Sequence, residues 1–339
     1  MTILSVLDLA PIAQGSDAAT SFRNSLTLAR HVEALGFHRF WLAEHHGMPG
    51  IASAATAVLI GHIAGGTSSI RVGAGGIMLP NHSPLVIAEQ FGTLESLYPG
   101  RIDLGLGRAP GSDQVVARAL RRHLNTDPEA FPQDVLELME YFSADSKLPV
   151  TAVPGKGLSP EFWILGSSLF GAQLAAYLGL PYSFASHFAP QMLMQAIDVY
   201  RANFRPSKYL AQPYVMLGYN VFAADSDDEA HFLASSWQQS FVSLRNGRPI
   251  RLPPPVPDYT DSLALHERAM LDNVLSCTAI GDAAAVSHAV RQFIARTGAD
   301  ELIVTSNMYD HQARLRSYEI LAGVRDSLKP QAAAADRQP

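Results

Sequence analysis

Cysteine is almost absent from this chain: among its 339 residues there is a single one, Cys277. One cysteine cannot build a disulfide framework or a cysteine-rich metal site within a chain. Residues 1–15, MTILSVLDLAPIAQG, also lack the basic start and the sustained apolar core of a signal peptide. We therefore expect a reducing, cytoplasmic setting.

Long apolar runs and basic clusters are missing as well. No apolar stretch approaches the roughly 18 residues that a membrane-spanning helix needs. The net charge is −6, whereas binding to nucleic-acid phosphates needs a basic face. We expect no membrane partner and no nucleic-acid partner. With 47% hydrophobic residues, the chain has the composition of a globular protein with a large core.

Short apolar runs alternate with longer helical patterns along most of the chain. The runs that read as strands are residues 3–11, 37–46, 69–79, 101–110, 162–168, 181–188, 213–224 and 301–310. Strands that alternate with helices form a parallel sheet, because each helix connects two parallel neighbours. Eight strand–helix units predict an α/β fold of the (β/α)8 TIM-barrel type with insertions, and an open doubly wound sheet is the alternative.

One segment interrupts this alternation. Residues 245–262, RNGRPIRLPPPVPDYTDS, are rich in proline and irregular. Irregular segments of this length inside a compact domain are usually lids or mobile excursions. We predict one barrel domain over residues 1–328, with a lid at 245–262, and a disordered tail over residues 329–339.

Polar residues and glycines follow nearly every predicted strand. The active site of a barrel lies at the C-terminal ends of its strands. In chain order, the residues at these ends are Asp8, Glu44, His45, His46, Gly75, Gly76, Arg108, Ser167, Ser168, Ser186, His187, Asn220, Ser306 and Asn307. We expect these residues to converge on one face of the barrel.

Three of these residues favour binding of a phosphate group. Arg108 lies in GLGRAPG (105–111), where the glycine spacing and the position at the fourth strand do not match a dinucleotide fingerprint. Its guanidinium suits an anion, with a salt bridge to a loop carboxylate as the alternative. Ser167 and Ser168 precede a predicted helix, where they either cap the helix or help bind phosphate. Together with Arg108 they predict a phosphorylated cofactor.

The stretch FWLAEHHGMPG (40–50) ends a strand on Glu44, His45 and His46. Adjacent histidines point to opposite sides of a strand and no H-E-x-x-H pattern occurs, so we expect no metal site. One imidazole facing the barrel mouth suits proton transfer or a hydrogen bond to a reactive oxygen, and structural packing is the alternative. The paired glycines Gly75 and Gly76 would let the backbone approach a flat ligand.

Four stretches, in this order, resemble the bacterial luciferase-like flavin monooxygenases over nearly the whole chain, from Leu4 to about Leu321. They are WLAEHH (41–46), VGAGGIMLPNHSP (72–84), PGRIDLGLGRAPG (99–111) and LGSSLFGAQLAAYLGLP (165–181). The resemblance implies the following site residues: His45 as the catalytic imidazole, a non-prolyl cis peptide at Gly75–Gly76 against the flavin ring, and Arg108, Ser167, Ser168 and Gly171 around the FMN phosphate. We expect Glu44 or a backbone group to fix the tautomer of His45. We further expect Asp8 and His187 to line the substrate pocket.

The same resemblance implies an FMNH2-dependent monooxygenase that oxidises a small organic substrate with O2 through a flavin C4a-(hydro)peroxide. It also implies a separate NAD(P)H:flavin reductase and a homodimer. Two alternatives stay open: an F420-dependent hydride-transfer oxidoreductase of the same lineage, and a non-catalytic flavin-binding protein. Ser167 and Gly171 replace the acidic residue and the threonine of true luciferase, and Gly107 replaces its reactive cysteine. Light emission is therefore not expected.

Overall fold

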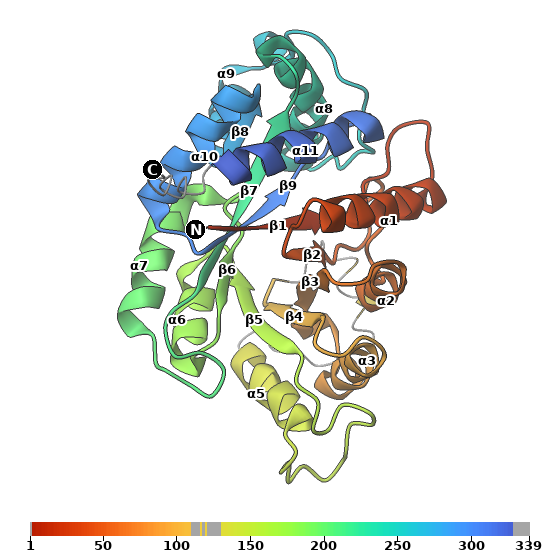
Figure 1. Cartoon of the computed structure of the whole chain (residues 1–339), viewed down its shortest axis with the longest axis vertical. Coiled ribbons are helices and arrows are strands. Elements are labelled where there is room, and N and C mark those ends of the chain that lie inside the picture. The colour runs from red at the N-terminus through yellow and green to blue at the C-terminus, as the bar shows by residue number, and fades with distance from the viewer. Residues whose placement is uncertain (1, 110–115, 117–118, 121–129, 328–339) are drawn as a thin grey trace, which may run out of the picture.

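The computed structural model describes residues 2–109, 116, 119–120 and 130–327. Within them, parallel strands close into a barrel with helices packed around it (Figure 1). The strands are β1 (Ile3–Asp8), β2 (Arg39–Leu42), β3 (Arg71–Met78), β4 (Ile102–Gly107), β5 (Glu161–Gly166), β6 (Tyr182–Phe184), β7 (Val215–Ala223), β8 (Thr278–Gly281) and β9 (Glu301–Thr305). β1 to β7 pair in sequence order, and β9 lies between β7 and β1. The predicted (β/α)8 barrel is confirmed.

The short strand β8 is an addition that the sequence pattern did not predict. β9 pairs with β7 over Met216–Asn220, and β8 pairs with β7 over Asn220–Ala223. β8 therefore extends the C-terminal end of β7 beyond the closed ring. Its four residues, TAIG, include only one large apolar side chain, which is why they carry no strand pattern.

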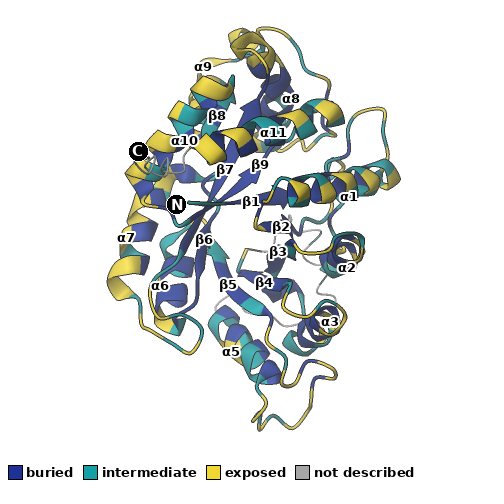
Figure 2. Cartoon of the chain, in the orientation of Figure 1, coloured by how far each residue is buried: buried dark blue, intermediate teal, exposed yellow. Residues whose placement is uncertain are grey.

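The helices cover the outside of the barrel, with their inner sides buried and their outer sides exposed (Figure 2). They are α1 (Ala18–Ala34), α2 (Thr56–Gly66), α3 (Pro84–Leu97), α5 (Phe131–Phe142), α6 (Leu169–Leu178), α7 (Leu193–Asn203), α8 (Asp227–Arg245), α9 (Leu265–Leu275), α10 (Ala283–Thr297) and α11 (His311–Ser327), with short 3-10 turns η1 (Leu79–Asn81), η3 (Pro190–Met192) and η4 (Tyr259–Ser262). Helix α9, with only Leu271 and Val274 buried, was not predicted. No helix in the described part of the chain has the length and apolarity to cross a membrane.

Alternate strand residues point inward and fill the barrel in layers. At the N-terminal end of the strands, the Arg39 guanidinium lies 2.7 Å from Asp103, 3.1 Å from Glu161 and 2.8 Å from Glu301. The next layer is apolar, with the Trp41 and Trp163 rings packed edge to face at 5.3 Å, joined by Leu7, Met216 and Ile303. These two layers leave the C-terminal end of the barrel for a site.

The proline-rich segment 245–262 crosses the C-terminal end of the barrel. Its backbone is tied to the loop after β1, because Leu252 donates to the Ile12 carbonyl at 3.0 Å and accepts from the Gln14 N–H at 2.8 Å. The Arg251 guanidinium also donates to the Ser16 carbonyl at 3.0 Å. The segment has the position of a lid, and its opening stays a prediction. The predicted disordered tail, residues 329–339, lies outside the described residues.

Candidate active site

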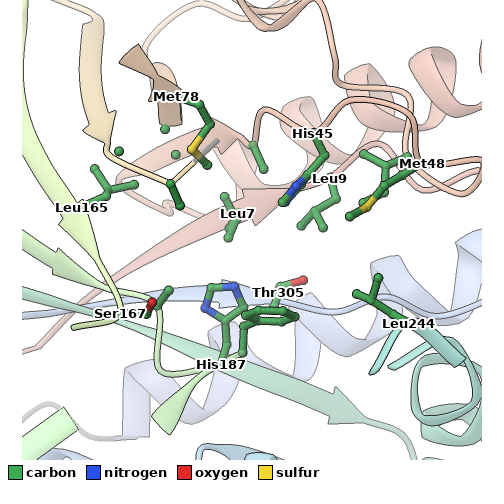
Figure 3. Close-up of a pocket in the computed structure, with 18 of the residues that line it drawn as sticks. Leu7, Leu9, His45, Met48, Met78, Leu165, Ser167, His187, Leu244 and Thr305 are labelled. Carbon is green, nitrogen blue, oxygen red and sulfur yellow. The ribbon is translucent and has the colours of Figure 1, made fainter. Parts of the chain in front are cut away.

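A cavity of about 880 Å³ lies at the C-terminal end of the barrel (Figure 3). Each strand of the closed ring, or the segment directly after it, contributes residues to its wall, and α8 and the 245–262 segment complete it. Pockets for small molecules usually measure ~300–1,000 Å³, so this cavity is large enough for a cofactor and a substrate.

Two histidines face each other across this cavity. His45 and His187 point into the same space from opposite walls (Figure 3). His45 continues the inward alternation of Trp41 on β2 and Ala43 just after it, which explains why it reaches the cavity. Burial, and to a lesser degree the charge of His45, lower the pKa of His187 to about 4. His187 is therefore a neutral imidazole at neutral pH. The prediction that it lines the pocket is confirmed.

Glu44 and His46 lie behind the cavity wall instead of in it. Glu44 is only 1% exposed, and its Oε1 lies 2.8 Å from both His46 Nε2 and His82 Nε2. Its Oε2 accepts a 2.9 Å hydrogen bond from the Met78 backbone N–H. Although burial favours the neutral acid, the contacts with His82 and His46 lower the pKa of Glu44. Glu44 thus braces the segments after β2 and β3, and its role in fixing the tautomer of His45 stays a prediction. No local sequence signal paired His82 with Glu44.

The Gly75–Gly76 peptide is cis and lines the cavity, as the family resemblance implied. Neither glycine has room for a side chain. A Cβ on Gly75 would lie 2.8 Å from Leu7 and 3.0 Å from Trp41, and a Cβ on Gly76 would lie 2.7 Å from the Gly105 carbonyl oxygen. This part of the wall is therefore bare backbone.

The residues predicted to bind phosphate all line the same cavity: Arg108, Ser167, Ser168 and Gly171. The Arg108 guanidinium stacks on Phe170, with its Cζ 4.1 Å from the ring centroid. Ser168 occupies the N-cap position of α6, and its side chain makes no capping hydrogen bond to the helix. The structure therefore brings a cation, two hydroxyls and a helix N-terminus together.

Asp8 does not line the cavity, and its prediction as a pocket residue is wrong. The strand alternation sends Leu7 and Leu9 to the cavity, so Asp8 points the other way, toward the helices. Its side chain is fully buried, lies 2.9 Å from Arg314 Nη2 and accepts a hydrogen bond from the Ser25 hydroxyl. Asp8 is thus half of a buried ion pair between β1 and α11.

Several neutral polar side chains line one part of the cavity, and His187 is the only one of them that was predicted as a substrate-pocket residue. We call them the neutral polar wall: His187, Asn220, Ser240, Thr305 and Asn307. Each has a buried nitrogen or oxygen without a hydrogen-bond partner among the described residues. Asn220 inside β7 and Asn307 after β9 are among the residues expected to converge, but Ser240 on α8 and Thr305 at the end of β9 carry no sequence signal. Nowhere in the described chain do three or more His, Cys, Asp or Glu side chains form a group that could hold a metal ion.

Comparison with known proteins accounts for this arrangement. A family model described as luciferase-like monooxygenase matches residues 2–301. The chain belongs to the luciferase-like monooxygenase family. Its relatives in the family include a luciferase-like monooxygenase of Escherichia coli (strain K12), 54% identical over 325 residues, which are 96% of this chain and 97% of that protein.

Two further members extend the comparison. The N-acetyl-S-alkylcysteine monooxygenase of Bacillus subtilis (strain 168) is 34% identical over 259 residues, which are 74% of this chain and 77% of that protein. The solved structure of apo-MsnO8 matches with a TM-score of 0.85 and 36% identity, over 96% of this chain and 99% of that one. The luciferase-like barrel is therefore shared along its whole length.

Proposed function

We propose that this luciferase-like protein is an FMNH2- and O2-dependent monooxygenase that oxidises a small organic substrate. One observation carries the proposal: His45, the bare Gly75–Gly76 backbone and the Arg108 corner all line a single cavity. A proton-handling imidazole, a flat wall and an anion site are the three features that a phosphorylated flavin enzyme needs together.

The residues present fit FMN. Arg108, the two hydroxyls of Ser167 and Ser168 and the N-terminal N–H groups of α6 suit its phosphate, since a helix N-terminus and a guanidinium both stabilise negative charge. The Gly75–Gly76 backbone offers a surface without side chains to the flat ring. When bound, reduced FMN supplies the two electrons that let one atom of O2 enter the product while the other leaves as water.

The side chains of this chain would then manage one proton and exclude water. His45 would hold or deliver a proton at the ring nitrogen that faces the cavity, because an imidazole can do either near neutral pH. Neutral His187 adds no second positive charge opposite it. The 245–262 segment, which places Pro249, Ile250 and Leu252 on the cavity, would keep bulk water away from the reaction.

The fold alone does not choose between FMN and F420. The oxygenating constituent of a diketocamphane monooxygenase, solved in complex with FMN, shares the fold at 18% identity and a TM-score of 0.67. A secondary alcohol dehydrogenase with an F420-acetone adduct shares it at 16% identity and a TM-score of 0.69. The choice of FMN is supported by membership of the luciferase-like monooxygenase family, in which the 34%-identical relative is named a monooxygenase.

Two partners belong to the proposal. A separate NAD(P)H:flavin reductase would supply FMNH2, as the resemblance implies, and the chain would act as a homodimer in a cytoplasmic setting. A mixture of this protein with such a reductase and NADH tests the first point: O2 uptake that requires both proteins and FMN would support it.

Anaerobic titration with reduced FMN and reduced F420, followed by flavin fluorescence, tests the cofactor. We expect reduced FMN to bind more tightly, and Arg108→Leu to weaken that binding by about tenfold or more, as the loss of a charge-assisted hydrogen bond implies. An exposed arginine that does not line the cavity, Arg316, gives the matched control Arg316→Leu. Tighter binding of reduced F420 would instead favour the hydride-transfer oxidoreductase.

A further inference from the structure

Two residues of the neutral polar wall, Asn220 and Thr305, lie across the barrel from Gly75–Gly76 and Arg108, which are assigned to FMN. In the closed strand order, β7 is opposite β3 and β9 is opposite β4. Asn220 on β7 therefore faces the Gly75–Gly76 side, and Thr305 on β9 faces the Arg108 side. This wall is available to a second ligand.

The orientation of the Asn220 amide follows from its neighbours. Its Nδ2 lies 2.8 Å from the His187 carbonyl oxygen and 3.2 Å from Thr278 Oγ1. The carbonyl can only accept, and Thr278 already donates its hydroxyl hydrogen to the Val274 carbonyl at 3.1 Å. Both contacts therefore use the two hydrogens of Nδ2, which leaves Oδ1 as an acceptor and fixes the amide.

Asn220 is only 1% exposed, and its buried Oδ1 has no hydrogen-bond donor among the described residues. Thr305 is 2% exposed, and its hydroxyl likewise has no hydrogen-bond partner among the described residues. A buried acceptor without a donor is unfavourable, and native structures leave few of them. Two such groups on the wall of one cavity indicate that a bound molecule completes their hydrogen bonds.

The rest of the wall defines what that molecule is like. Arg108, His45 and His187 are the ionisable side chains among the described residues that line the cavity, and no carboxylate joins them. Arg108 belongs to the phosphate corner and His45 to the proton step, so the described residues of this wall leave no charged side chain to pair with a charged substrate. Trp237, Phe241 and Leu244 of α8 supply an apolar surface beside Asn220 and Thr305.

We propose that the neutral polar wall binds the substrate, and that Asn220 selects a neutral, largely apolar molecule carrying an N–H or O–H donor. This inference rests on the proposed monooxygenase function and names its substrate class. Asn220 Oδ1 accepts the hydrogen bond from the substrate, Thr305 adds a second one, and the α8 side chains cover the apolar part.

Matched pairs of probes test this by calorimetry on the protein loaded with oxidised FMN. The pairs are N-hexylacetamide against N-hexyl-N-methylacetamide, and octanol against methyl octyl ether, in which a methyl group replaces only the donor hydrogen. We expect the donor-bearing member to bind about tenfold or more tightly, since a site built for a hydrogen bond rejects the analogue without it. Asn220→Leu should abolish that preference, and Thr305→Val, which keeps the side-chain shape, should reduce it.

Asn203, exposed on α7 and remote from the cavity, supplies the matched control Asn203→Leu, which should keep the preference. FMN affinity and thermal melting of each variant show whether it is folded and loaded. Equal binding within each pair, a preference that survives Asn220→Leu, or no binding of any donor-bearing probe would overturn the inference while FMN binding stands. Weaker FMN binding in folded Asn220→Leu would assign the wall to the flavin instead. Loss of FMN binding by the wild type would refute the proposed function itself.

Discussion

At the scale of single residues, the cavity owes its chemistry to which groups are charged and which are neutral. His187 stays neutral because burial, together with the charge of His45, lowers its pKa to about 4. Arg108, which follows β4, lies in the wall of the same cavity. The cation Arg108, the imidazole of His45 and the neutral imidazole of His187 thus line one and the same cavity.

Acidification should destabilise the protein through His187. Between pH 6.5 and about 4, the unfolded chain binds a proton at this imidazole that the folded chain does not. The free energy of unfolding therefore falls as pH falls through this window. Denaturant unfolding across the window should show a shallower decline for His187→Gln than for the wild type, because the variant has no imidazole to protonate. Parallel declines would contradict the neutral assignment.

Asp8 tests the distinction between a site residue and a structural one. Asp8→Asn would leave the Arg314 guanidinium buried without its counter-charge, which should lower the free energy of unfolding by about 3–5 kcal/mol. The exposed partner of Arg316 gives the control Asp225→Asn, expected to cost about 0–1 kcal/mol. The FMN affinity of folded Asp8→Asn should equal that of the wild type. A weaker FMN affinity with unchanged stability would mean that Asp8 takes part in the site after all.

Strand alternation explains what the sequence could and could not predict about these residues. It correctly separated His45 from His46, since adjacent residues point to opposite faces. The same rule, applied to Leu7, Asp8 and Leu9, would have excluded Asp8. No sequence rule could pair Glu44 with His82, because their contact depends on how the segments after β2 and β3 pack.

At the scale of elements, the 245–262 segment is the part of the fold that closes the site. Gly50 marks how closely it packs, because a Cβ there would lie 2.3 Å from the Ile250 carbonyl oxygen. The Leu252–Ile12 backbone hydrogen bond holds the same stretch. The composition of this segment indicated a lid, but neither its contacts nor helix α9 behind it could be derived from a stretch with no regular period.

Gly50→Ala should push this segment away from the cavity, since the added methyl group would overlap the Ile250 backbone. We expect trypsin to cut at least several-fold faster after Arg248 and Arg251, and bound FMN to dissociate faster. Gly323→Ala is the matched control, because a Cβ there meets nothing within 4 Å. Unchanged proteolysis and unchanged FMN dissociation would show that the segment does not cover the site.

At the scale of the whole molecule, an ionic layer ties the barrel together beneath the site. Arg39 on β2 contacts carboxylates on β4, β5 and β9. Although burial favours its neutral form, Asp103 and Glu301 outweigh that effect and hold the pKa of Arg39 above its ordinary value. The order of the strands was predictable from their alternation with helices, but this layer was not, because its members are scattered along the chain.

Arg39→Met should leave Glu301 buried without its cation and leave Asp103 with Arg71 alone. We expect the free energy of unfolding to fall by about 3–5 kcal/mol, measured by urea denaturation. Arg268→Met, which breaks an exposed 3.5 Å pair with Asp261, should change it by about 1 kcal/mol or less. A similar small loss for both variants would mean that the ionic layer contributes little to holding the barrel closed.

The central claim is that this cavity controls the reaction of reduced FMN with O2 through His45. Stopped-flow mixing of the anaerobic protein–FMNH2 complex with oxygenated buffer tests it directly, with the return of oxidised-flavin absorbance as the signal. We predict that oxidised-flavin absorbance returns much more slowly with the protein than with free FMNH2. His45→Ala should accelerate this return by about a hundredfold, the lower range of what one acid–base group contributes. His62→Ala, at an exposed histidine, should leave the rate unchanged. A return as fast as that of free FMNH2, or one indifferent to His45→Ala, would contradict the claim.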